Sequence, residues 1–139
     1  MILNKAGCLK GVFRTSEPLF QAADGTPSYI LLRFYEDGLV LHASLCKDVE
    51  AKWDEIEQWF NRDAAATEEK GWGTGAGTYT LKGSQVEFST VTYDRETRLR
   101  VDLEHSGEVE GDCLRVQTKL VDDPRVVEHV FIPLRAAQN

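Results

Sequence analysis

Apolar and polar residues alternate along most of this chain with the period of two that is typical of half-buried β-strands. Two apolar, aromatic-rich runs flank Asp37-Gly38, and Asp-Gly between such runs is among the strongest short-range signals of a β-hairpin. Further turns rich in Gly, Asp and Pro separate the later runs. The pattern predicts eight strands, at 11–15, 29–36, 39–45, 78–82, 85–93, 98–110, 113–121 and 126–134.

One stretch, residues 48–62, departs from this alternation and has the spacing of a helix face. Val49, Trp53, Ile56 and Phe60 are separated by four, three and four residues, and acidic residues occupy the other side. We therefore predict one amphipathic helix inserted between the third and fourth strands. Whether it closes the mouth of the fold as a lid or covers its outer wall stays open.

Short strands joined mostly by hairpin turns predict a mainly β protein with a single domain over residues 1–139. The expected architecture is an eight-stranded antiparallel up-and-down barrel, because closure removes the exposed sheet edges. Eight strands leave an interior wide enough for side chains or for one small ligand. A half-open roll packed on the helix is the alternative.

The alternation also predicts which side chains face the interior. Four charged residues of the strand at 98–110 alternate with apolar ones, and burying them would cost more than the fold provides. Leu103 and His105 therefore face inward. The same rule directs Tyr79 and Phe88 of the preceding strands to the interior.

The strand at 29–36 is apolar on both faces, which predicts that both faces are covered. In one orientation Phe34 faces the interior and Arg33 extends outward, where it pairs with an acidic residue of the helix. In the other, Arg33 lies inside with Tyr29 and Tyr35 and forms a clamp for a carboxylate. The sequence alone leaves both orientations open.

Composition excludes several classes of partner. The formal net charge of −7 argues against a nucleic-acid partner, since such binding depends on phosphate neutralisation. No apolar run approaches the roughly 18 residues of a membrane-spanning helix. Three widely spaced cysteines favour a reducing compartment, and hence a cytoplasmic location. The apolar segment before Cys8 is too short for a signal peptide if Met1 is the native start; a signal segment removed from a longer chain stays open.

Several local sequences together resemble a known group of proteins. They are GVFR at 11–14, LRFYEDG at 32–38, GTYTLKG at 77–83 and EGDCL at 110–114. The combination, over roughly residues 11–134, is similar to small, largely uncharacterised bacterial proteins with lipocalin-like (calycin-type) β-barrels. The resemblance implies a barrel that holds a small molecule. Three features depart from lipocalins: Phe13 stands where they carry Trp, the predicted helix precedes the fourth strand instead of following the last, and their usual disulfide is not evident.

No motif in the chain indicates a particular catalytic chemistry. The glycine-rich stretch at 71–77 lacks the third glycine of a dinucleotide fingerprint and the lysine of a Walker motif. His42, His105 and His129 each fall on a predicted strand, but no pair has the spacing of metal ligands. We consider a zinc site and a general-base role for His105, and favour an interior histidine hydrogen-bonded to a neighbour. No metal or cofactor is predicted.

The function that these features favour is binding of a small apolar or amphipathic molecule inside the barrel. Two alternatives stay open: a barrel-type cyclase or isomerase using one interior acid or base, which is the less favoured, and a ligand-free interaction module or homodimer. A cavity of about 300 Å³ or more would favour the first two. The predicted ligand-binding residues are Phe34, Tyr79, Phe88, Leu103, His105 and Arg33.

Overall fold

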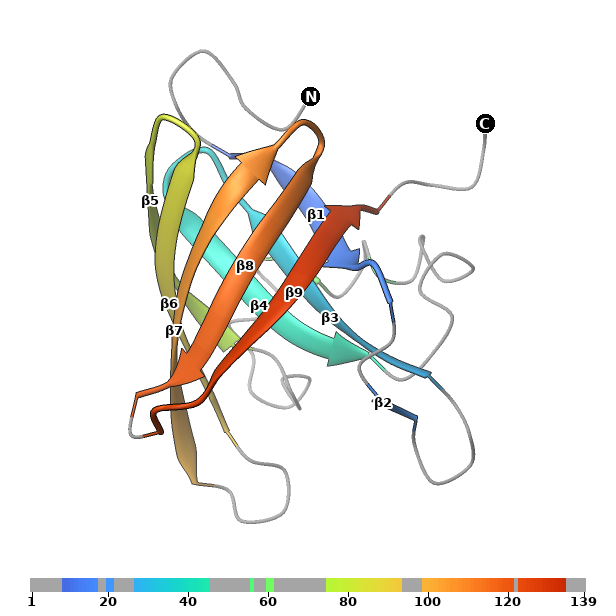
Figure 1. Ribbon diagram of the computed structural model, residues 1–139, viewed down its shortest axis with the longest axis vertical. Helices are drawn as coiled ribbons and strands as arrows, with labels where there is room; N and C mark the ends of the chain where they lie inside the picture. The colour runs from blue at the N-terminus through green and yellow to red at the C-terminus, as the bar shows by residue number, and fades with distance from the viewer. Residues whose placement is uncertain are drawn as a thin grey trace.

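A computed structural model describes residues 9–17, 20–21, 27–45, 56, 60–61, 75–93, 99–121 and 123–134. Within these residues nine strands form one sheet (Figure 1). Their bounds are β1 (Gly11–Thr15), β2 (Phe20–Gln21), β3 (Pro27–Phe34), β4 (Leu39–Leu45), β5 (Gly75–Lys82), β6 (Gln85–Tyr93), β7 (Arg100–Glu110), β8 (Cys113–Leu120) and β9 (Val126–Pro133).

The sheet closes on itself as an antiparallel barrel of eight strands. From β3 to β9 each strand pairs with the next one along the chain, and β1 pairs with both β9 and β3. The two-residue β2, which the sequence pattern did not predict, extends the sheet beside β3. Figure 1 shows the strands tilted around a common axis, with β8 and β9 in front of β3 and β4. The predicted mainly β, antiparallel barrel is confirmed.

The central hairpin reverses at the predicted place, with a loop of three residues, 36–38, where the sequence predicted two. Gly38 lies between β3 and β4 with φ of 99°, a conformation that residues with a Cβ rarely adopt. The Tyr35 N–H donates to the Leu39 carbonyl at 2.9 Å, and the Gly38 N–H donates to the Tyr35 carbonyl at 3.1 Å. The sequence signal Asp-Gly therefore predicted the correct place for the chain to reverse.

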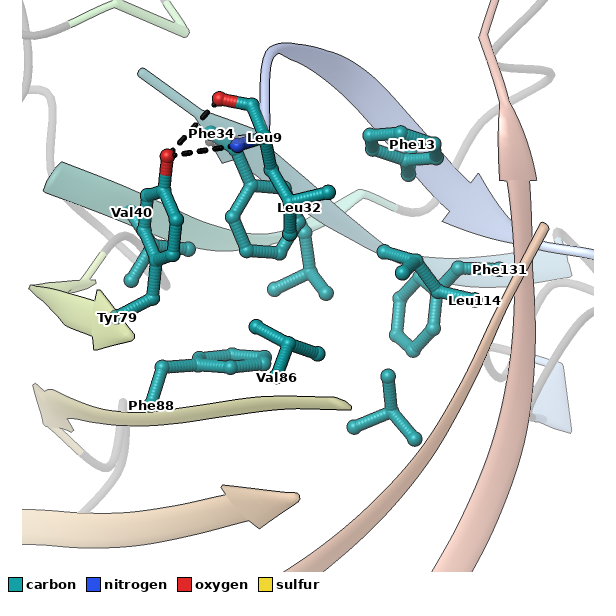
Figure 2. Packing of buried hydrophobic residues seen from close by; sticks show 11 residues of the cluster. Leu9, Phe13, Leu32, Phe34, Val40, Tyr79, Val86, Phe88, Leu114 and Phe131 are labelled. Atoms are coloured by element: carbon teal, nitrogen blue, oxygen red, sulfur yellow. Dashed lines mark hydrogen bonds between the residues drawn. The ribbon is translucent and has the colours of Figure 1, made fainter. Parts of the chain in front are cut away.

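One end of the barrel is filled by buried apolar side chains, here called the inner cluster (Figure 2). The ring of Phe34 lies at its centre and makes edge-on contacts with three other rings at centroid distances of 5.2–5.8 Å. Aromatic pairs prefer this geometry because the positive edge of one ring meets the negative face of another. The buried members are Leu9, Phe13, Leu32, Phe34, Val40, Tyr79, Val86, Phe88, Leu114, Val116 and Phe131.

A second group of buried side chains, the outer cluster, covers the opposite face of β3 and β4. Arg33 extends along this face and donates through a guanidinium N–H to the carbonyl of Phe60 at 2.7 Å. The prediction that β3 is covered on both sides is confirmed, and the orientation with Arg33 inside the barrel is wrong. The buried members of the outer cluster are Val12, Leu31, Leu41, Ala43, Ile56, Phe60 and Leu134.

The helix predicted over residues 48–62 is not supported. The structure describes only Ile56, Phe60 and Asn61 of this stretch, and the remaining residues lie outside the described part of the chain. Ile56 and Phe60 are fully buried, as the helical spacing predicted. Within the described residues no helix has the length and apolar character needed to span a membrane.

Candidate functional site

The other end of the barrel holds a cavity of about 460 Å³. Most of its wall surface is apolar, although seven of the thirteen lining residues carry polar or charged side chains, and apolar surface with placed polar groups is the usual character of a small-molecule site. The lining side chains come from β3, β4, β7, β8 and β9 and from the turn between the last two. They are Ile30, Leu32, His42, Leu103, His105, Thr118, Lys119, Leu120, Asp123, Arg125, Val127, His129 and Phe131.

The cavity lies beside the part of the wall that β1 does not cover. β1 has five residues against eight in β3 and β9. Its pairing with β9 ends at Thr15 opposite Phe131, followed by a hydrogen bond from the Ser16 N–H to the Val130 carbonyl. Among the described residues no strand pairs with the earlier part of β9 on the side away from β8. In the sequence, Pro18 follows the last residue of β1 by three positions, and proline cannot donate to a strand ladder.

His105 is fully satisfied within the barrel. Its two ring nitrogens lie 2.9 Å from the Thr90 hydroxyl and 2.8 Å from the Thr118 hydroxyl, and its ring stacks on Phe88 with a centroid distance of 4.3 Å. Burial, with a further contribution from His42, lowers the pKa of His105 to about 3, so the ring is neutral at pH 7. The expected hydrogen-bonded interior histidine is therefore present, and threonines on the neighbouring strands are its partners.

His42 occupies the same interior without such partners. It follows Val40 on the inward row of β4, is 7% exposed, and its ring centroid lies 6.1 Å from that of His105. The Nδ1 atom is buried and has no hydrogen-bond partner among the described residues. Burial lowers the pKa of His42 to about 4. Sequence reasoning missed this residue because both faces of β4 are apolar, which left the direction of His42 ambiguous.

His129 is the third histidine on the cavity wall, and burial lowers its pKa as well. The three rings thus come from three different strands. Within the part of the chain that the structure describes, no group of three or more His, Cys, Asp or Glu side chains has a geometry that could hold a metal ion. The zinc site considered from the sequence therefore gains no support from these residues.

Charged groups at the mouth of the cavity are paired with one another. Arg125 and Asp123 form an ion pair at 2.7 Å, and the hydrogen bond from Arg125 lowers the pKa of Asp123 to about 2. Lys119 lies 3.9 Å from Glu104. Both cations therefore already face a carboxylate, which reduces the positive potential available to an anionic ligand.

The structure separates the six predicted ligand-binding residues into three places. Leu103 and His105 line the cavity. Phe34, Tyr79 and Phe88 point into the barrel as predicted but belong to the inner cluster and are not among the cavity's lining residues. Arg33 lies on the outer face, where its guanidinium also sits over the Tyr35 ring at 5.1 Å, so an interior carboxylate clamp is excluded.

A second hollow, of about 550 Å³, lies against the outward side chains of β5 to β8. It is lined by polar and charged groups such as Thr80, Glu87 and Gln117, most of them exposed. Exposed polar side chains of this kind are expected on the solvent-facing side of an antiparallel sheet. The interior cavity combines apolar walls with buried polar atoms, and we therefore take it as the candidate site.

Fold and site together define a small antiparallel β-barrel that is packed at one end and hollow at the other. No protein-family model, curated protein or solved structure matches this chain.

Proposed function

We propose that this protein binds a small apolar or amphipathic molecule inside its barrel, as the lipocalin-like resemblance of its sequence implies. The observation that carries the proposal is the interior cavity of about 460 Å³, which falls within the roughly 300–1,000 Å³ of small-molecule sites. Ile30, Leu32, Leu103 and Phe131 supply apolar wall area. Burial of a ligand's apolar surface against them would provide most of the affinity, at about 25 cal/mol per Å².

Two observations weigh against the alternatives. A ligand-free module would need no cavity of this size, since protein interiors are normally packed without large voids. A cyclase or isomerase would need an interior base that is effective near neutral pH. Burial lowers the pKa of His42 to about 4 and that of His105 to about 3, which makes both rings weak bases at pH 7. Binding therefore has better support than catalysis.

The direct test is titration with N-phenyl-1-naphthylamine, an uncharged dye whose fluorescence rises in apolar surroundings. Wild-type protein should bind it saturably with a stoichiometry of one. Leu103→Trp places a larger side chain in the cavity and should weaken binding at least tenfold. Gln85→Trp adds the same side chain at an exposed position in the opposite half and should leave binding unchanged. Absence of saturable binding to the wild type, or equal binding by both variants, would contradict the proposal.

Other predictions from the sequence have partial support only. A helix over 48–62 stays a prediction; the hydrogen bond of 2.7 Å from the Phe60 N–H to the Ile56 carbonyl has helical spacing and is compatible with it. A homodimer is supported by Val126 and Val127, which are 55% and 51% exposed, and size-exclusion chromatography would test it. A cytoplasmic location stays a prediction, and the free thiol of Cys113 is compatible with it.

A further inference from the structure

We infer that the ligand of the cavity carries an uncharged hydroxyl group, and that this group lies against Nδ1 of His42 with the apolar body toward the mouth. The inference rests on the proposed binding function and adds the chemistry and orientation of the ligand. It depends on one contrast: of the two neighbouring imidazoles, His105 has partners for both nitrogens, whereas Nδ1 of His42 has none among the described residues.

A buried polar atom without a partner costs free energy, and native proteins normally pair such atoms. Nδ1 of His42 has no accessible surface as the ring stands, and His42 lines a cavity that is large enough for an organic molecule, so a ligand meets this atom when the ring turns toward the cavity. Because Nδ1 has no partner among the described residues, this turn breaks no hydrogen bond of that atom, and a group bound there would gain one. Leu32, the cross-strand neighbour of His42, supplies apolar surface beside that position.

The surroundings favour an uncharged group over a carboxylate. The nearest cations that line the cavity, Lys119 and Arg125, lie at its mouth and already face Glu104 and Asp123. A carboxylate at His42 would lose its hydration without gaining an unpaired positive charge, and burying a charge in this way is costly.

A hydroxyl is also the uncharged group that suits either form of the ring. A neutral imidazole carries its proton on one nitrogen, so Nδ1 is a donor in one tautomer and an acceptor in the other. A hydroxyl both donates and accepts, so it pairs with His42 in both cases. A carbonyl or ether oxygen pairs with only one tautomer. Phenols and alcohols with a compact apolar body are therefore the predicted ligand class.

The test compares three molecules of matched shape as competitors of N-phenyl-1-naphthylamine at pH 7: 2-naphthol, naphthalene and 2-naphthoate. We expect 2-naphthol to bind roughly threefold to tenfold more tightly than naphthalene, the size of one net hydrogen bond, and 2-naphthoate to bind most weakly. In His42→Phe the advantage of 2-naphthol over naphthalene should disappear. His129→Phe alters the same cavity without touching Nδ1 of His42 and should retain the advantage.

The other outcomes separate this inference from the binding function itself. Equal affinities for 2-naphthol and naphthalene, or tightest binding of 2-naphthoate, would overturn the inference while leaving a binding barrel in place. Failure of the wild type to bind the dye or any competitor would overturn both. If His42→Phe does not fold, the ¹⁵N chemical shift of His42 Nδ1 in the wild type decides: 2-naphthol should move it and naphthalene should not, and equal spectra would contradict the inference.

Discussion

At the scale of single residues, the two interior histidines show how cross-strand neighbours decide the state of a buried polar group. His105 pairs with Thr118 across the β7–β8 ladder, and Thr90 reaches its other nitrogen from β6. His42 is opposite Leu32 on β3 and Gly75 on β5, neither of which has a polar side chain. The inward direction of His105 was predictable from the alternation along β7. The partners were not, because they depend on the register between strands.

The two histidines predict a stability that falls as the pH drops from 7 to 5. Burial lowers the pKa of His42 from 6.5 to about 4, so between these values the unfolded chain binds a proton that the folded chain excludes. Stability is therefore complete above about pH 6.5 and is lost progressively as the pH falls toward 4. His42 alone should lower the free energy of unfolding by about 2 kcal/mol from pH 7 to pH 5.

Urea unfolding at the two pH values measures this loss. In His42→Phe, the loss of unfolding free energy between pH 7 and pH 5 should be smaller than in the wild type by about 2 kcal/mol, the contribution of His42. The contribution of His105 should remain in this variant. Equal unfolding free energies of the wild type at both values would show that neither ring is held neutral by burial.

At the scale of elements, the glycine-rich start of β5 has a structural role. The sequence pattern placed the beginning of this strand at residue 78, whereas β5 starts at Gly75. A Cβ built on Gly77 would come within 1.6 Å of the Ser89 carbonyl oxygen on β6. Only glycine permits this close approach of the two backbones. Periodicity could not reveal it, because glycine contributes no apolar signal to the alternation.

Gly77→Ala should consequently destabilise the barrel by about 2 kcal/mol or more, because the added methyl group must push β5 away from β6. Chemical denaturation with urea measures the change. Thr80→Ala is the matched control, since Thr80 is on the same strand and exposed, and it should change stability by less than about 0.5 kcal/mol. Equal effects of the two substitutions would refute the close-packing argument.

The outer cluster is the second element-scale feature, and the helical spacing of the sequence predicted two of its members. Phe60 and Ile56 are fully buried against β3 and β4. Phe60→Ala should therefore cost about 3–5 kcal/mol, the range for removing a buried phenylalanine side chain. Leu99→Ala, at a site that is 67% exposed, is the control and should be nearly neutral. A loss below about 1 kcal/mol for Phe60→Ala would mean that the outer face does not depend on this cover.

At the scale of the whole molecule, the barrel divides into a packed half and a hollow half. The order and direction of the strands followed from hairpin signals and alternation, and every inward residue assigned from the sequence on β5 and β6 is indeed inward. The sequence did not predict which half is hollow. That depends on side-chain volumes summed across opposite walls: Phe13, Phe34 and Phe88 meet in one half, while smaller residues and imidazoles face one another in the other.

Tyr79 lies in the packed half and connects it to the chain segment at Leu9. Its hydroxyl accepts a hydrogen bond from the Leu9 N–H at 2.9 Å (Figure 2). It donates to the Tyr35 carbonyl, 2.6 Å away. The Leu9 carbonyl lies 2.9 Å from the same hydroxyl. One side-chain oxygen therefore serves several buried backbone groups at the end of the barrel that is closed by packing.

This division predicts that stability and binding respond to different substitutions. Tyr79→Phe removes the hydroxyl, leaves buried backbone groups without their partner, and should lower the free energy of unfolding by about 1–3 kcal/mol. Its affinity for N-phenyl-1-naphthylamine should stay within about twofold of the wild type, because neither Tyr79 nor Leu9 lines the cavity. Leu103→Trp should show the reverse, a large loss of dye affinity with a small change in urea midpoint. If either variant lost stability and affinity together, the two halves would be energetically coupled, and the packed half could not be treated as a scaffold separate from the site.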